Sequence, residues 1–384
     1  MRVLIAGGGT GGHLFPGIAL AEEVTTRHPQ NDVVFVGTRR GLEARVVPAA
    51  GFKLETITSR GLKGMSPVNL LLGLLALPLS FIESLYFLLK YKPDVVVGVG
   101  GYSSGPVVMA AWMLGIPTAV QEQNALPGAT NKVLGKFVKA VFLAFDEARR
   151  FFPEKKIHVI GNPIRRKLLD NYLRSSIAHD KFTILVFGGS LGAKGLNSRV
   201  LDALKHLEDL KPELKFIHQT GKADLDTVRA GYAEKSYDAD VVEFIDDMSS
   251  AYAKSELVIC RAGATTLAEL TVCKKAAILV PFPFATDDHQ AINAGALVNA
   301  GAAVMFREAE LDGAKLAAEI RALKADGERR KKMEKAAGML GRPEAAREIA
   351  DVCMEMMWKK WGEKGRHGHA KAKEQSSKAK EKAS

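Results

Sequence analysis

The chain has 384 residues, which is enough for two domains that each bury a core of their own. The composition is ordinary for a folded α/β protein and excludes a fibrous or wholly disordered class, and the three cysteines form no CxxC pair, so we expect buried free thiols in an intracellular, disulfide-free protein. The formal net charge of +11 suits nucleic acid or an anionic membrane face, and charge alone does not choose between them.

The chain opens on an apolar run that ends in glycines, VLIAGGGTGGHLFP at residues 3–16. Apolar side chains recur at helical spacing from Leu14 to Val24, and Pro16 suits a first helical turn, so the pattern predicts a strand, a tight turn and a helix. The apolar run is too short for a signal peptide. Because a helix start offers free N–H groups and the positive end of a dipole, we expect this turn to hold a phosphate-bearing ligand.

Apolar runs and helical stretches alternate through the first half of the chain. The runs are mostly continuous Val, Ile and Leu, which is typical of parallel strands covered on both faces, so we predict an α/β fold with a doubly wound sheet. The predicted strands are Arg2–Ala6, Asp32–Gly37, Asp94–Gly101, Thr118–Gln123, Ala140–Phe145 and Ile157–Gly161.

One connection in this half, Val68–Leu89, is almost entirely apolar. As a helix it would be about 33 Å long, enough to cross a bilayer. A crossing is disfavoured by Pro78 at its middle, and because the strands before and after it belong to one sheet. We predict two short helices, broken at Pro78, that lie on one leaflet of a membrane, and a buried pair of crossover helices is the alternative.

The second half repeats the organisation of the first. A strand at Phe182–Phe187 runs into GGSLGA at residues 188–193, and a helix begins at about Lys194. Further strands are predicted at Lys215–His218, Val241–Phe244, Glu256–Cys260, Ala277–Val280 and Ala303–Phe306, and helices at Leu311–Lys324, Gly327–Ala337 and Pro343–Trp361. The remainder, Gly362–Ser384, is rich in Lys, Ala, Glu and Ser without an apolar period, which is typical of a disordered tail.

Glycine-rich turns follow several of these strands. Gly7, Gly9 and Gly12 match the dinucleotide fingerprint, but the second strand ends in GTRR without the acid that would bind the ribose of NAD, so an NADP-dependent oxidoreductase remains as an alternative. Similar turns at residues 98–105, 188–192 and 261–269 indicate a cleft that holds phosphates from both halves. No GxxxxGK[ST] motif occurs, which disfavours a P-loop NTPase.

Metal sites are not expected. Two aspartate pairs, Asp224 with Asp226 and Asp238 with Asp240, have the DxD spacing that chelates a divalent cation with a diphosphate. Both pairs lie in polar surroundings away from a strand terminus, which favours a solvated face. The nine histidines show no HxxxH or HExxH spacing, which disfavours a zinc site.

His13, which closes the first glycine turn, is the first candidate for a general base. The positive end of the helix dipole disfavours an imidazolium at this place, so the ring is able to accept a proton. A capping or packing histidine is the alternative. Glu122, at another strand end, is a second candidate for the base.

Eight motifs between the N-terminus and about residue 300 closely resemble, in the same order, those of one family. This is the family of N-acetylglucosaminyltransferases that complete the lipid-linked disaccharide of bacterial peptidoglycan. The motifs are GGGTGGH (residues 7–13), GVGGYSSGP (98–106), EQNALPG (122–128), GNPIR (161–165), GGSLGA (188–193), EFIDDM (243–248), CRAGATTLAE (260–269) and PFPFATDDHQAINA (281–294).

The resemblance implies the GT-B fold, in which two Rossmann-like, doubly wound parallel-sheet domains face each other across a cleft. It implies an N-terminal acceptor and membrane domain at 1–163, a donor domain at 164–340, and a helix at 341–361 that packs back on the first domain. The basic disordered tail at 362–384 is predicted from composition alone. The resemblance also implies the reaction. The C4 hydroxyl of undecaprenyl-diphospho-N-acetylmuramoyl-pentapeptide attacks the anomeric carbon of UDP-GlcNAc, the configuration inverts from α to β, and UDP leaves, with no cofactor.

The same resemblance assigns roles to individual residues. In the second domain Ser190, Arg165 and the helix start at Ala264, Thr265 and Thr266 would hold the diphosphate. Ile245 would contact uracil through its backbone, Glu269 the ribose, and Gln290 the GlcNAc hydroxyls, with Asn293 as a neighbour. From the first domain, Thr10, Gly11, Gly12 and Asn124 would complete the donor site and face the acceptor, and His13 would assist acceptor deprotonation or diphosphate binding.

A polyprenyl acceptor implies a peripheral enzyme on the cytoplasmic face of the bacterial plasma membrane. The apolar connection Val68–Leu89 would then serve as the contact with this membrane. Nucleic acid is not an expected partner. The lysine-rich tail has no counterpart in the family pattern, so that anionic-lipid binding and a solvated tail both stay open. The rival hypotheses are a UDP-GlcNAc 2-epimerase, a glycolipid synthase, the NADP oxidoreductase, and a non-catalytic membrane or nucleic-acid binding module.

Overall fold

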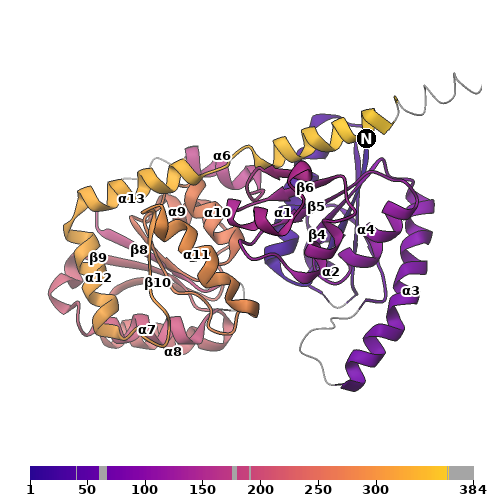
Figure 1. Cartoon of the computed structure of the whole chain (residues 1–384). Coiled ribbons are helices and arrows are strands. Elements are labelled where there is room, and N and C mark those ends of the chain that lie inside the picture. The colour runs from indigo at the N-terminus through magenta and orange to yellow at the C-terminus, as the bar shows by residue number, and fades with distance from the viewer. Residues whose placement is uncertain (40, 60–66, 175–179, 190–191, 361, 363–384) are drawn as a thin grey trace, which may run out of the picture.

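The computed structural model describes residues 1–39, 41–59, 67–174, 180–189, 192–360 and 362, with residues 67–76 described by their backbone alone. The chain forms two α/β domains that lie side by side (Figure 1). Each domain is built on one parallel sheet, so the predicted pair of doubly wound parallel-sheet domains is confirmed.

The first sheet has seven strands in the order β3-β2-β1-β4-β5-β6-β7. The strand order reverses on either side of β1, and in such folds ligands bind outside the carboxyl ends of the strands at this point. Gly7, at the end of β1, lies in register with Gly100, at the end of β4. The bounds are β1 Arg2–Gly7, β2 Asp32–Gly37, β3 Lys53–Thr56, β4 Val95–Gly100, β5 Thr118–Glu122, β6 Ala140–Leu143 and β7 Ile157–Val159.

The second sheet has six strands in the order β10-β9-β8-β11-β12-β13, with its reversal beside β8. Its central strands are buried on both faces. All three cysteines are buried and free, as predicted. The bounds are β8 Phe182–Phe187, β9 Leu214–Gln219, β10 Asp238–Val242, β11 Leu257–Cys260, β12 Ala277–Leu279 and β13 Ala303–Met305.

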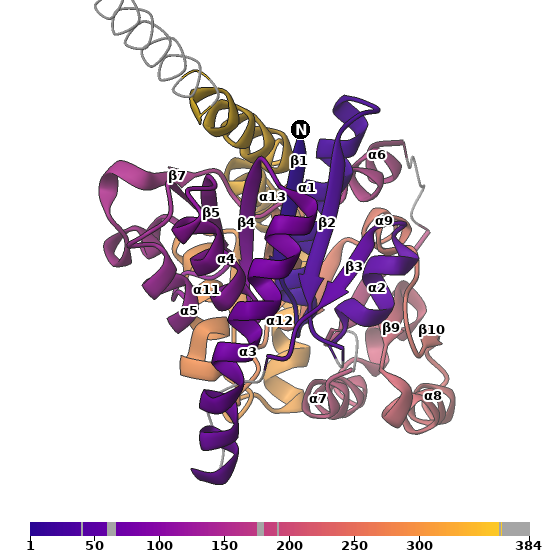
Figure 2. The same ribbon diagram turned by 90° about the vertical axis from the view of Figure 1, so that its right-hand side faces the viewer.

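Helices cover both faces of each sheet, as Figure 2 shows for the first domain. In the first domain they are α1 Gly11–Arg27, α2 Glu43–Ala49, α3 Pro67–Tyr91, α4 Ser104–Met113 and α5 Ala129–Leu134. In the second they are α6 Arg166–Arg174, α7 Lys194–Leu204, α8 Leu225–Glu234, α9 Met248–Ala253, α10 Ala264–Val272, α11 His289–Asn299, α12 Gly313–Ala325 and α13 Gly327–Leu340.

Two strands differ from the predictions, and both are edge strands. The sequence analysis did not predict β3, whose four residues include none that is buried and show no apolar run. The strand predicted at Val241–Phe244 begins three residues earlier, as β10. Its polar start is held by ion pairs, Lys181 with Asp238 at 2.8 Å and Lys215 with Asp240 at 3.0 Å. Apolar patterning does not detect strands stabilised in this way.

The predicted break at Pro78 is wrong. α3 runs without interruption from Pro67 to Tyr91, with Pro78 inside it. A proline removes one helical hydrogen bond. In a helix of 25 residues the remaining hydrogen bonds outweigh that loss. Within the part of the chain that the structure describes, no helix is long and apolar enough to cross a membrane.

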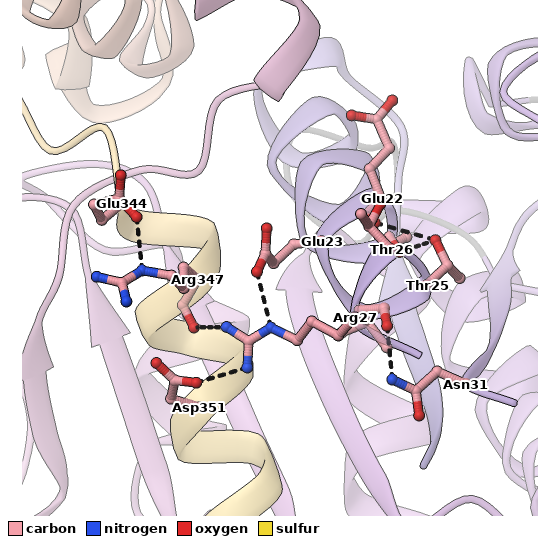
Figure 3. A network of polar contacts seen from close by, with 11 residues as sticks. Glu22, Glu23, Thr25, Thr26, Arg27, Asn31, Glu344, Arg347 and Asp351 are labelled. Atoms are coloured by element: carbon pink, nitrogen blue, oxygen red, sulfur yellow. Dashed lines mark hydrogen bonds and ion pairs between the residues drawn. The ribbon is translucent and has the colours of Figure 1, made fainter. Parts of the chain in front are cut away.

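A last helix, residues 345–360, follows α13 and returns to the first domain (Figure 1, yellow). Its buried residues Ile349 and Cys353 belong to the same core cluster as Val3 and Val24. Arg27, at the end of α1, ties this helix in place (Figure 3). Its guanidinium donates to Asp351 at 2.6 Å, to the carbonyl of Arg347 at 2.7 Å, and to Glu23 at 2.8 Å.

The chain therefore crosses between the domains twice, once through residues 161–165 and once through residues 341–345. The two crossings touch each other. Gly161 has a φ of +104°, and a Cβ placed on it would lie 2.5 Å from the Cβ of Arg342, so this position requires glycine.

Candidate active site

The first glycine turn packs backbone against backbone on the turn after β4. The N–H of Gly8 donates to the carbonyl of Gly100 at 3.3 Å. A Cβ on Gly101, whose φ is +83°, would lie 2.5 Å from the carbonyl oxygen of Gly8. This close approach brings the start of α1 over the carboxyl end of β4, at the point of strand reversal.

A buried carboxylate that the sequence analysis missed supports this turn. Glu43 is 1% exposed and accepts hydrogen bonds from the N–H of Gly9 at 2.8 Å and from the N–H and hydroxyl of Thr38 at 2.9 and 2.8 Å. A Cβ on Gly8, Gly37 or Gly41 would collide with it. Because Glu43 uses the N–H of Gly9, the donors left for a ligand are those of the helix start at residues 10–12. No local signal in the sequence marks this residue, because the three glycines meet around it only in the folded chain.

His13 lies in the first turn of α1 and is partly buried. Its Nδ1 is 3.0 Å from the side-chain oxygen of Gln123. A Cβ on Gly100 would lie 2.7 Å from Nδ1, so glycine at this position lets the ring rest on the backbone of the neighbouring turn.

Glu122, the second candidate for the base, is a structural residue. It is 1% exposed, and four donors surround its carboxylate: the N–H groups of Asn124 and Gly128 at 3.0 and 3.1 Å, and the side-chain amides of Asn131 and Asn124 at 2.9 and 3.3 Å. These four donors occupy both oxygens of the carboxylate. Its role is to shape the loop that carries Asn124.

Asn124 meets the second domain directly. Its side-chain oxygen accepts a hydrogen bond from Asn293 of α11 at 3.1 Å. The oxygen of Asn293 accepts in turn from the N–H of Ala125 at 2.9 Å. The structure thus brings together two residues, 169 positions apart in the chain, that the resemblance placed at one site.

The start of α10 forms the opposite wall. Gly263 precedes it in extended backbone, and no side chain caps the helix, so the N–H groups of Ala264, Thr265 and Thr266 have no capping acceptor. The buried hydroxyl of Thr265 also lacks a partner among the described residues. α10 contacts α1 of the first domain, so that two helices whose starts follow glycines approach each other between the domains.

Glu269 lies within α10, and the charge of Arg165 acts on it. The guanidinium of Arg165 lies 5.5 Å from the ring of Phe15 on α1, and its side chain is exposed. Burial raises the pKa of Glu269 to about 7, against the opposing effects of a hydrogen bond from the Tyr252 hydroxyl at 3.0 Å and of the positive charge of Arg165. Glu269 is partly buried and thus titrates near neutral pH.

Gln290 and Ile245 are oriented by the backbone around them. The oxygen of Gln290 accepts from the N–H groups of Ala262 at 3.2 Å and Phe282 at 2.9 Å, which leaves its NH₂ group to donate. The N–H of Ile245 donates to the side chain of Gln219 at 2.9 Å. The carbonyl of Ile245 is therefore the backbone group left to contact the nucleobase of a ligand. Ser190 lies outside the described residues.

The two aspartate pairs, which the sequence analysis expected on a solvated face, do not join this group. Asp224 accepts from Asn197 at 2.9 Å, and Asp238 and Asp240 form the ion pairs of β10. Across the described residues, no group of three or more His, Cys, Asp or Glu side chains is placed to hold a metal ion. The sequence analysis also missed Arg261, whose buried guanidinium pairs with Glu308 and holds the carbonyls of Val280 and Pro281 at 3.1 Å.

A cavity of about 220 Å³ lies between the domains beside these residues. The turn after β6, residues 144–147, and the crossing segment line one side of it, and α10 and α11 line the other. Asn162 lines it as well, and its buried side-chain amide has no partner among the described residues.

Comparison with known proteins shows one family over both domains. Residues 3–143 match the glycosyltransferase family 28 N-terminal domain and residues 183–351 the glycosyltransferase family 28 C-terminal domain. A Myxococcus xanthus protein, named UDP-N-acetylglucosamine–N-acetylmuramyl-(pentapeptide) pyrophosphoryl-undecaprenol N-acetylglucosamine transferase, is 70% identical over 366 residues, which are 95% of this chain and 96% of that protein. A protein of the same name from Anaeromyxobacter sp. strain Fw109-5 is 62% identical and covers 94% of this chain and 95% of its own length.

Solved structures give the same picture. The crystal structure of Acinetobacter baumannii MurG is 32% identical, with a TM-score of 0.75 over 92% of this chain and 99% of that one. A UDP-GlcNAc 2-epimerase from Neisseria meningitidis bound to UDP-GlcNAc has a TM-score of 0.67 at 16% identity, over 92% of this chain and 100% of that one, which shows a common fold alone.

Proposed function

Because the chain belongs to glycosyltransferase family 28 and has the GT-B fold, we propose that the residues gathered between its domains form the site of glycosyl transfer. The chain is a UDP-GlcNAc-dependent N-acetylglucosaminyltransferase. It transfers GlcNAc to the C4 hydroxyl of undecaprenyl-diphospho-N-acetylmuramoyl-pentapeptide and forms the β1,4-linked disaccharide precursor of peptidoglycan. The observation that best supports the site is the approach of α1 and α10, each of which starts with N–H groups that no side chain caps.

In this proposal the second domain binds the donor. The N–H groups of Ala264, Thr265 and Thr266, with Ser190 and Arg165, hold the diphosphate. The carbonyl of Ile245 faces uracil, the carboxylate of Glu269 accepts from the ribose hydroxyls, and the NH₂ of Gln290 donates to a GlcNAc hydroxyl. From the first domain Thr10, Gly11, Gly12 and Asn124 complete the donor site and face the acceptor, and Asn293 holds Asn124 in place.

The chemistry follows from this arrangement. The acceptor C4 oxygen forms a bond to the anomeric carbon as the bond from that carbon to the diphosphate oxygen breaks, and the configuration inverts. The departing UDP gains negative charge, which the helix start of α10 and Arg165 are already oriented to stabilise. His13 accepts the hydroxyl proton, because the carboxylate of Glu122 is fully occupied by its four donors.

The acceptor's lipid requires contact with a membrane, and α3 offers an apolar surface for it. Leu79, Ile82, Tyr86 and Leu89 recur at helical spacing and are 48–62% exposed. α3 packs against α4, whose end adds the exposed side chains of Trp112 and Met113. The chain thus lies on the cytoplasmic face of the bacterial plasma membrane as a peripheral protein, held by apolar contact and by anionic lipids. The basic tail, for which the sequence analysis left lipid binding and a solvated tail both open, falls outside the described residues beyond Gly362.

Turnover tests the function directly. Release of UDP from UDP-GlcNAc should require the lipid-linked muramoyl-pentapeptide acceptor. Release of UDP without acceptor, or conversion of UDP-GlcNAc into a second UDP-sugar, would instead favour the hypothesis of a UDP-GlcNAc 2-epimerase.

Two adjacent arginines test the donor site. Arg165→Ala should weaken UDP-GlcNAc binding about tenfold in calorimetry, since it removes a charged contact to the diphosphate. Arg166→Ala is the matched control, because Arg166 is equally exposed and pairs with Asp170 at 3.8 Å. Equal affinities of the two variants would refute the assignment of Arg165.

A further inference from the structure

The residue that faces Nδ1 of His13, Gln123, determines which nitrogen of the ring carries the hydrogen. Gln123 is 1% exposed and follows directly after β5. Its side-chain nitrogen lies 2.9 Å from the carbonyl oxygen of Val99, on β4. Its side-chain oxygen lies 3.0 Å from Nδ1 of His13.

These two contacts determine which way the amide of Gln123 faces. The carbonyl of Val99 can only accept a hydrogen bond, so the NH₂ group of Gln123 must be the atom that faces it. The oxygen of Gln123 then faces Nδ1, and an amide oxygen can only accept. Nδ1 of His13 must therefore carry the hydrogen.

A neutral imidazole carries a single N–H, so a hydrogen on Nδ1 leaves the lone pair on Nε2. Among the described residues Nε2 has no hydrogen-bond partner. Gly100 supports this orientation, because its missing side chain leaves room for the Nδ1 edge of the ring, at 2.7 Å from where a Cβ would lie. The ring is thus held by one edge, and the nitrogen on the opposite edge is the one available to a substrate.

We propose that Gln123 is a positioning residue for the transfer reaction: it holds His13 as the Nδ1–H tautomer and so makes Nε2 the atom that accepts the proton of the acceptor hydroxyl. This inference rests on the proposed role of His13. A carboxylate at this position would attract the imidazolium electrostatically, whereas the neutral amide selects the tautomer by hydrogen bonding alone. Because Gln123 is 1% exposed, it acts on the reaction through the ring of His13.

Two variants separate this role from simple packing. Gln123→Met and Gln123→Glu both lose the donation to Val99, but only the glutamate keeps an acceptor that faces Nδ1. Gln121→Met is the matched control. Gln121 is equally buried on β5 and also donates to a backbone carbonyl, that of Gly161 at 3.2 Å, but it makes no contact with His13.

The first readout is the tautomer itself. In full-length protein labelled with ¹⁵N-histidine, the two ring nitrogens of His13, assigned by the loss of their signals in His13→Gln, should show the Nδ1–H form in the wild type, in Q121M and in Q123E. In Q123M the Nε2–H form should appear. A wild-type Nε2–H tautomer, or a Q123M ring that stays Nδ1–H, would overturn the proposal.

The second readout is turnover with UDP-GlcNAc and the lipid-linked acceptor. Q123M should lower kcat about five- to tenfold, the effect of one hydrogen bond, with UDP-GlcNAc affinity unchanged, and Q123E should recover part of the loss. Preserved UDP-GlcNAc binding also shows that a variant is folded. If Q123M changes the tautomer but leaves kcat at the wild-type value, Gln123 does position the ring and it is the proposed role of His13 as the base that fails.

Discussion

At the scale of a single residue, the proposed contact of Glu269 with the ribose would couple donor binding to pH. Its pKa of about 7 results chiefly from burial, and the carboxylate must be ionised to accept two ribose hydroxyls. The affinity for UDP-GlcNAc should therefore fall as the pH is lowered, by up to about tenfold between pH 8 and pH 6. UDP-GlcNAc is the proper probe, since its diphosphate diester does not titrate in this range. Calorimetry at a series of pH values measures the effect.

Glu269→Gln provides the control, because it cannot ionise. This variant should bind UDP-GlcNAc more weakly than the wild type at pH 8 and with nearly the same affinity at pH 6. A wild-type affinity that stays constant from pH 8 to pH 6 would contradict the proposed contact to the ribose.

His218 makes a second residue-scale prediction, for stability. It is fully buried between the hydroxyl of Tyr232 and the side chain of Asn197, each at 3.1 Å, and burial lowers its pKa to about 3. The unfolded chain binds a proton there below pH 6.5 and the folded chain does not, so this residue's contribution to the free energy of unfolding is lost as the pH falls from 6.5 towards 3, by about 1.4 kcal/mol per pH unit.

Urea unfolding at a series of pH values tests this. His218→Gln should be less stable than the wild type at pH 7, and its free energy of unfolding should depend less on pH between 6.5 and 4. Parallel pH profiles of the two proteins would contradict the prediction.

The motifs predicted the glycine turns and helix starts correctly, but they did not predict the hydrogen-bond partners of the side chains. Glycine turns and helix starts are local, so residues 7–13 and 263–266 were predictable from spacing alone. Whether Glu122 is a base or a scaffold depends on Asn131 and on a loop of seven residues folding around it, which no spacing encodes. Glu43 was missed for the same reason, because its three glycine neighbours meet only in the folded chain.

At the scale of elements, α3 is the clearest difference between pattern and structure. Proline inside an apolar run favours a break, yet the helix continues, because the penalty of one lost hydrogen bond is small beside 25 residues of helix. Its exposed apolar face belongs to one rigid element. A membrane that binds this face therefore orients the whole first domain.

Charge on that face should weaken membrane binding. The double variant Ile82→Glu with Leu89→Glu, at two positions about 60% exposed, should lose more than about tenfold in binding to vesicles that contain anionic lipid, since each side chain contributes on the order of 1.5–3 kcal/mol when it is buried in lipid. Co-sedimentation measures the bound fraction, and UDP-GlcNAc affinity should not change.

Met339→Glu controls for the general loss of an exposed apolar side chain. Met339 is 74% exposed on α13, in the second domain. Vesicle binding by the double variant at the level of Met339→Glu would exclude α3 as the contact.

At the scale of the whole molecule, the last helix makes the first domain depend on residues far along the chain. Ile349 is fully buried in the core that β1 and α1 build. Ile349→Ala should lower the free energy of unfolding of the first domain by about 2–5 kcal/mol. Hydrogen exchange of the amides of β1 and β2 should quicken accordingly, while that of β8 and β11 should not.

Arg347→Ala, which removes an exposed side chain of the same helix, should change stability by no more than about 0.5 kcal/mol. If Ile349→Ala destabilised β8 and β11 as much as β1 and β2, the two domains would unfold as one unit and the assignment to the first domain would be wrong.

The two crossings that touch at Gly161 and Arg342 connect the domains at one place. Two tethers at one place should oppose sliding of one domain along the other more than they oppose rotation. The residues proposed to bind uracil, ribose and diphosphate lie in the second domain, whereas Asn124 and the proposed base lie in the first, so a rotation between the domains would separate the two sets. The distance between the attacking oxygen and the anomeric carbon would then depend on the angle between the two domains. A side chain at position 161 would reset that angle, and with it the rate of transfer, without touching a single atom that binds either substrate.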